Sequence, residues 1–143
     1  MRILISPQSD TMLLDSLTGM NGTFDQLQAF LEGSDTDIEF PAKMSGPLEA
    51  DEGWLRGLRV RKGEGPIRLV RGPDQFLELS GSLANLARYI RHFSFDENEE
   101  GTHHHPEHEY DAAGPLPGYM SPDSEWLIVE VDSDYVAELE DES

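Results

Sequence analysis

The chain has 143 residues, about the size of one domain, and 37% of them are hydrophobic, enough to fill a single core. It contains no cysteine, which excludes disulfides, thiolate metal sites and a cysteine nucleophile. Lys and Arg number 10 against 29 Asp and Glu, for a formal net charge of −19. A charge of that sign repels nucleic acid and anionic membranes. The acidity is interpreted either as a means of keeping the protein soluble or as complementarity to a basic partner protein.

The N-terminal part, residues 1–53, is predicted to fold as strand, helix, strand and loop. Residues 2–5 are a predicted short strand, and the apolar run near the N-terminus is too short for a signal peptide or a membrane span, so we expect a cytoplasmic protein. A Gly- and Ser-containing stretch follows. Residues 23–26 have the form of a capping box with Thr23 as N-cap, and the apolar residues after it recur at helical spacing up to Gly33. Residues 37–40 are the next predicted strand.

Residues 54–132 hold the predicted main sheet and the clearest helix. Ser82 is the expected N-cap of a helix over 83–93, whose apolar stripe should lie against the sheet through Leu83, Leu86 and Ile90. The residues after 132 are expected to form a solvated acidic tail, 133–143. The expected fold is α+β, one mainly antiparallel sheet with two amphipathic helices packed on one face. The strands predicted in this part are 55–61, 67–70, 76–79 and the central strand 125–131.

A concentrated group of histidines and carboxylates lies between that helix and the last strand. Imidazole is a common zinc ligand, and an extended segment would place His103 and His105 on one face, with His108 as a third ligand. Pro106 interrupts the alternation, and no His-Glu-x-x-His helix is present. Another interpretation of the same segment is an exposed edge strand or loop, made polar to discourage unwanted pairing. A third interpretation is a partner contact made by His104, Glu107, Glu109 and Tyr110.

Motifs of the common catalytic classes are missing from the sequence. No serine stands in a Gly-x-Ser-x-Gly elbow, and no phosphate-binding or dinucleotide-binding glycine motif occurs. We therefore predict no catalytic residue and no bound cofactor other than a divalent metal such as zinc at the histidines. The expected class is a non-enzymatic binding protein.

Three segments of the C-terminal half carry a family resemblance: residues 76–82 leading into the helix, residues 103–110, and residues 121–130. Together they resemble the Imm32-type immunity proteins of bacterial polymorphic toxin systems, over about residues 67–132. The resemblance implies a small α+β module with a histidine-containing strand and a role in binding and neutralising a cognate toxin. It implies no catalytic residues. The alternative hypothesis is a small metal-binding protein or metalloenzyme built on the histidines.

Overall fold

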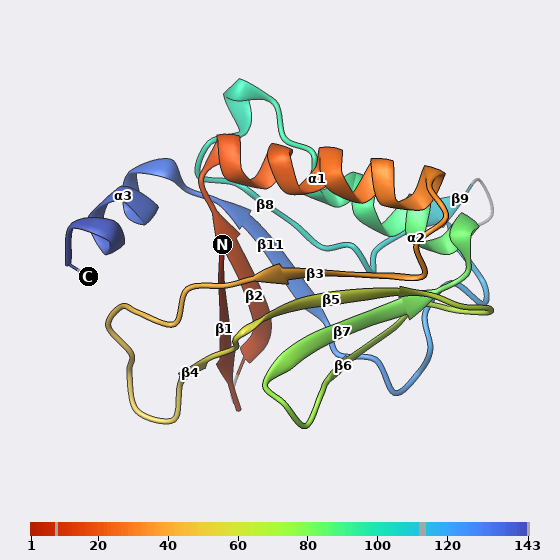
Figure 1. Cartoon of the computed structure of the whole chain (residues 1–143), viewed down its shortest axis with the longest axis horizontal. Helices are drawn as coiled ribbons and strands as arrows, with labels where there is room; N and C mark the ends of the chain where they lie inside the picture. The colour runs from red at the N-terminus through yellow and green to blue at the C-terminus, as the bar shows by residue number, and fades with distance from the viewer. Residues whose placement is uncertain (8, 112–113, 143) are drawn as a thin grey trace.

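A five-stranded sheet, a four-stranded sheet and three helices make up the fold (Figure 1). The structure is a computed structural model that describes residues 1–7, 9–111 and 114–142. Strand pairs are antiparallel except for two parallel ones, β2 with β11 and β5 with β7. The α+β class predicted from the sequence is confirmed. Of the described helices, none is both long and apolar enough to cross a membrane.

The five-stranded sheet has the order β4-β1-β2-β11-β8. Strand β11 lies between two neighbours, as predicted for the apolar segment near the C-terminus. The Gly- and Ser-containing stretch after the first strand was expected to be only a connection, but its first part forms strand β2. This strand makes an antiparallel hairpin with β1, in which Leu4 pairs with Met12. The strands are β1 (Arg2–Ser6), β2 (Ser9–Asp15), β4 (Gly53–Trp54), β8 (His103–His104) and β11 (Leu127–Val131).

The four-stranded sheet has the order β3-β5-β7-β6 and holds the other predicted strands. The single sheet expected from the sequence is therefore wrong. The chain leaves the first sheet at Leu55, whose amide donates to the carbonyl of Ile3, and enters the second at Arg56, whose amide donates to the carbonyl of Gln75. These strands are β3 (Asp37–Pro41), β5 (Gly57–Lys62), β6 (Arg68–Arg71) and β7 (Phe76–Gly81), and a small hairpin is formed by β9 (Tyr110–Asp111) and β10 (Gly114–Pro115).

Helix α1 (Leu17–Glu32) begins earlier than predicted. Its N-cap is Ser16, whose hydroxyl accepts a hydrogen bond from the amide of Gly19 at 3.0 Å. Thr23, the predicted N-cap, is buried inside the helix. The helix ends at Gly33 as predicted.

Helix α2 (Leu83–Ile90) is capped by Ser82 as predicted and continues into a 3₁₀ turn, η1 (Arg91–Phe93). Leu86 and Ile90 are buried, whereas Leu83 is 52% exposed, so its predicted place in the core is wrong. Figure 1 shows α1 and α2 side by side over the sheets. A second 3₁₀ turn, η2 (Glu97–Glu99), precedes β8.

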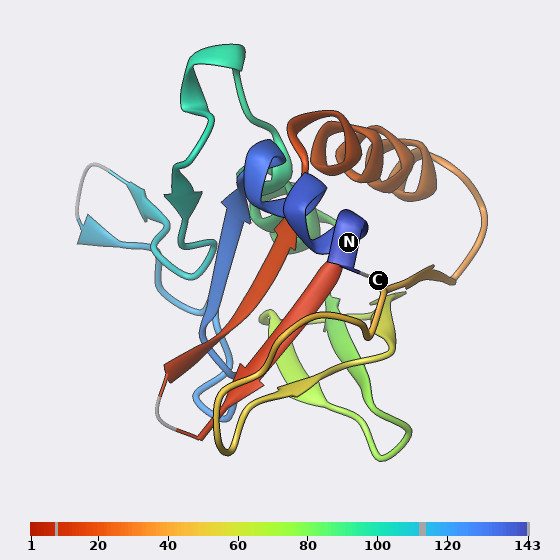
Figure 2. The same ribbon diagram turned by 90° about the vertical axis from the view of Figure 1, so that its left-hand side faces the viewer.

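The residues expected to form an acidic tail fold instead as helix α3 (Ser133–Glu142). Val136 and Leu139 of this helix pack with Leu14 of β2 in a small cluster separate from the main core. Neighbouring β2 residues point to opposite faces of the sheet, and Leu13 belongs to the main core under α1 and α2. Helix α3 therefore covers the other face of the sheet, as the side view in Figure 2 shows.

Candidate functional site

The outer face of the five-stranded sheet, opposite α1 and α2, carries a groove. The side chains of Leu4, Met12 and Leu14 form its apolar floor. On one side stands the loop between β3 and β4, with Pro47 and Leu48, and on the other stands α3. We call this the sheet groove. Its volume is about 450 Å³, and its remaining lining residues are Glu49, Glu52, Trp54, Glu130 and Tyr135.

Apolar side chains of the groove walls are unusually exposed. Leu48 and Tyr135 both line the groove, and both are among the exposed large hydrophobic residues described in this chain. Trp54 lies deeper, paired through β4 with Leu4 of β1. Exposed apolar surface gathered in one place marks an interaction site rather than random surface variation.

Three carboxylates, Glu49, Glu52 and Glu130, lie among these apolar side chains. Burial raises the pKa of Glu130 above its ordinary value, and the nearby charge of Asp132 raises it further, while His103 acts in the opposite direction. No hydrogen bond or ion pair within the described part of the chain neutralises Glu130. One oxygen of Glu52 accepts from the amide of Glu49 at 2.7 Å, which orders this lip of the loop. The groove therefore combines an apolar floor with a negative lip.

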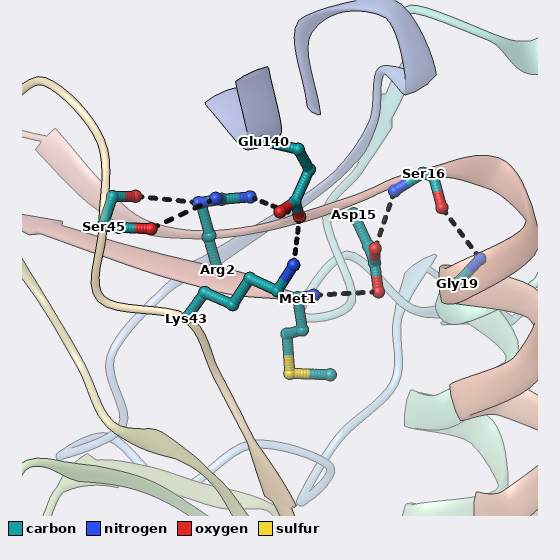
Figure 3. Close-up of polar contacts among 8 residues, drawn as sticks. All are labelled: Met1, Arg2, Asp15, Ser16, Gly19, Lys43, Ser45 and Glu140. Carbon is teal, nitrogen blue, oxygen red and sulfur yellow. Dashed lines mark hydrogen bonds and ion pairs between the residues drawn. The ribbon is translucent and has the colours of Figure 1, made fainter. Parts of the chain in front are cut away.

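A network around Arg2 joins the two walls of the groove (Figure 3). The Arg2 guanidinium is buried; its Nε donates to the carbonyl of Ser45 at 2.9 Å, and one terminal nitrogen lies 3.4 Å from a carboxylate oxygen of Glu140. Lys43 pairs with the same carboxylate, and the two cations, Lys43 first, lower the pKa of Glu140. The loop and α3 are thereby tied to β1 and to each other.

Close packing reinforces that network. A Cβ atom added to Gly46, which has a φ of +134°, would lie 3.1 Å from Trp54 and 3.2 Å from Leu139. The loop therefore approaches β4 and α3 at a position where only glycine fits well. Both walls of the groove are fixed before any partner binds, which reduces the ordering cost of association.

The three histidines predicted as metal ligands do come together. The ring of His105 lies 5.0 Å from that of His103 and 5.1 Å from that of His108, measured between centroids, and His108 contacts Trp126 at 5.6 Å. The rings of His105 and His108 stack, whereas the ring of His103 meets that of His105 edge to face. Within the ranges that the structure describes, no three His, Asp or Glu side chains are arranged to hold a metal ion. A zinc site thus stays a prediction.

The residues predicted to contact a partner are largely occupied within the fold. His104 stacks on Phe95 at 4.1 Å and has its two ring nitrogens 2.9 Å from the carbonyl of His92 and from a carboxylate oxygen of Glu99. Both partners accept, so both bonds form together only when both ring nitrogens carry a proton. This histidine holds η1 and η2 against β8.

Glu109 is similarly engaged, at 3.2 Å from Arg91 and 3.0 Å from His92. Burial lowers the pKa of His92, although Glu109 opposes that effect. The side chain of Tyr110 lies outside the described residues. Glu107 is nearly buried, so among the predicted groups His103 and His108 are the exposed ones.

Sequence reasoning missed the sheet groove because its lining comes from β1, β2, the loop at 47–52, β4, β11 and α3. The only local signal was the helical spacing of Val136 and Leu139 within the acidic C-terminal segment. Nothing in the sequence indicated that this spacing belonged to a groove wall.

Comparisons with protein-family models, with curated proteins and with solved structures gave no match for this chain.

Proposed function

We propose that this protein is a non-enzymatic binding protein whose sheet groove receives a basic segment of a partner protein. The observation that carries the proposal is the combination of an apolar floor with the negative lip formed by Glu49, Glu52 and Glu130. Apolar clefts with a few placed polar groups are the usual form of a binding site. The uncompensated carboxylate of Glu130 favours Lys or Arg in the occupant.

The chemistry of the groove defines the occupant further. Leu4, Met12 and Leu14 would contact apolar side chains, while the flanking carboxylates would contact cations next to them in sequence. Exposed Tyr135 provides an aromatic side chain of the kind that dominates binding energy in protein interfaces. The partner segment should therefore alternate or mix apolar and basic residues.

A basic toxin is the partner that best fits the whole chain. The net charge of −19 favours association with a basic protein, and the resemblance of residues 67–132 to immunity proteins supports neutralisation as the biological outcome. We include the cytoplasmic location in this proposal, since an immunity protein acts where its cognate toxin would cause damage. No catalytic role or resident cofactor is needed for such a function.

The proposal is tested with a basic toxin candidate encoded next to this gene, using affinity measurements and protection of growing cells. Tyr135→Ala should weaken binding by about tenfold or more, as for an aromatic anchor. Leu83→Ala is the control, because Leu83 is also an exposed large hydrophobic residue, 52% against 40% for Tyr135, but lies on α2, on the opposite side of the sheet. Association should slow as the Debye length falls to about 10 Å, whereas dissociation should change less.

Two results would contradict the proposal. One is a partner whose affinity is unchanged by Tyr135→Ala, which would remove the groove from the binding surface. The other is a basic neighbour that neither binds nor kills unprotected cells, which would remove the immunity role.

A further inference from the structure

A second pocket lies at the start of β11, away from the sheet groove. Its volume is about 220 Å³, and Glu107, His108, Met120 and Trp126 are among the residues that line it. We call this the Trp126 pocket. Trp126 is 56% exposed, the largest exposed fraction among the large hydrophobic residues described.

Glu107 provides a carboxylate at the bottom of this pocket. Its side chain is only 4% exposed. One oxygen accepts from the amide of Leu127 at 3.3 Å, which fixes the carboxylate at the first residue of β11. The other oxygen accepts no hydrogen bond from the described residues. A buried carboxylate without full hydrogen bonding is costly, so its retention calls for a functional reason.

Two carboxylates next to lining residues of this pocket, those of Asp123 and Glu125, differ from Glu107 because each is paired with an arginine. Asp123 pairs with Arg68 at 2.8 Å, and Glu125 pairs with Arg71 at 2.7 Å. Beside Glu107 lies His105, whose Nδ1 is 3.7 Å from the unbonded oxygen. Unlike Asp123 and Glu125, Glu107 has no Lys or Arg partner among the described residues.

Trp126 adds an aromatic surface beside that charge. Its ring meets the ring of His108 at 86°, so His108 fixes the orientation of the indole. Tryptophan is the best aromatic partner for a cation, and a guanidinium stacks on such rings more readily than an ammonium does. An indole beside an uncompensated carboxylate is suited to one cationic side chain.

We propose that the Trp126 pocket binds an arginine side chain of the partner protein, stacked on Trp126 and attracted by Glu107. The inference rests on the proposed function only in taking the partner to be a protein. It does not depend on the sheet groove. Arginine at such a position would be a second anchor, in line with the prominence of arginine and tryptophan at interface hot spots.

The test uses N-acetyl-arginine amide as the probe and the indole N–H signal of Trp126 in NMR as the readout, with Trp54→Phe to assign that signal. We expect a saturable shift with the arginine probe and none with the citrulline analogue, which has nearly the same shape without the charge. Glu107→Gln should weaken the arginine response by about tenfold, a loss of one charge interaction.

Several controls separate the pocket from the fold and from the groove. The Trp54 indole signal should be unchanged in Glu107→Gln, which shows that the variant is folded. If Glu107→Gln does not fold, it is replaced by Trp126→Leu, a substitution at an exposed position. In that variant, arginine should no longer shift the NMR signal of the Leu127 amide. Tyr135→Ala should leave arginine binding intact even where it abolishes partner binding. Equal shifts from arginine and citrulline, or a response unaffected by these substitutions, would overturn the inference.

Discussion

The substitution Leu139→Ala tests whether helix α3 forms a stable wall of the sheet groove. Leu139 is 1% exposed and packs with Leu14 and Val136 in a cluster of three buried residues. Truncating a buried leucine typically costs about 2.7–5 kcal/mol, with lower values where the surroundings can collapse. Because this cluster is small and peripheral, we expect about 2–3 kcal/mol.

Most of that loss should appear as local opening of α3. Besides this cluster and the Arg2 network, α3 is held at its first residue, where the Ser133 hydroxyl accepts from the amide of Leu17 and Ser133 donates to Glu100. The later turns of the helix can therefore open while the main core stays folded. A change of 2–3 kcal/mol corresponds to amide exchange about 30- to 150-fold faster. Hydrogen exchange should show this acceleration in α3 and little change at Leu27 in α1.

The matched control is Leu83→Ala, the same chemical change at an exposed leucine of a different helix. It should leave exchange in α3 unaltered. The partner's affinity should fall in Leu139→Ala, since the groove loses a wall, and should be retained in the control. Equal acceleration in α1 and α3 would show that α3 unfolds only with the whole domain, and unchanged exchange in α3 would refute the assigned packing of Leu139.

Three further outcomes are expected. Leu86→Ala should lower the free energy of unfolding by about 2–5 kcal/mol in urea denaturation, because Leu86 is fully buried. Glu130→Gln should raise the free energy of unfolding at pH 7, because the raised pKa of Glu130 means that ionising this side chain opposes folding. The gain should disappear below the ordinary pKa of 4.5, where the carboxyl group is protonated in both the folded and the unfolded state. The same variant should bind the partner more weakly. His103→Ala with His105→Ala should change stability by less than about 0.5 kcal/mol, and calorimetry at pH 7.5 should find no submicromolar one-to-one zinc complex.

Helix α2 and strand β11 were predictable because their signals are local. Ser82 precedes an apolar stripe at helical spacing, and its hydroxyl does cap the helix through the amide of Asn85. In β11, every residue except Glu130 is apolar, as is typical of a strand with neighbours on both sides. Leu83 was misplaced: it lies on nearly the same helical face as buried Ile90, but it is the first residue of the helix and is exposed.

The start of α1 was not predictable, because two glycines in its first turns weaken the helical signal. The structure gives a reason for Gly19. A Cβ atom there would lie 2.4 Å from a carboxylate oxygen of Asp15. That carboxylate binds the N-terminal ammonium at 3.3 Å and accepts from the amide of Ser16 at 2.8 Å (Figure 3). Gly19 lowers the local helix propensity, but only glycine leaves room there for the Asp15 carboxylate, which links the N-terminal ammonium to the first turn of α1.

The distribution of charge explains how an acidic chain can be selective. In β5, Arg59 contacts Glu39, Asp74 and Glu78, at 2.7, 2.9 and 3.3 Å. Such pairs leave little positive potential on the four-stranded sheet. By contrast, Glu130 in the sheet groove and Glu107 in the Trp126 pocket have no Lys or Arg partner among the described residues. A lower local dielectric strengthens an ion pair. The carboxylates of Glu130 and Glu107, each among apolar side chains, can therefore attract a cation more strongly than the well-hydrated carboxylates elsewhere on the surface.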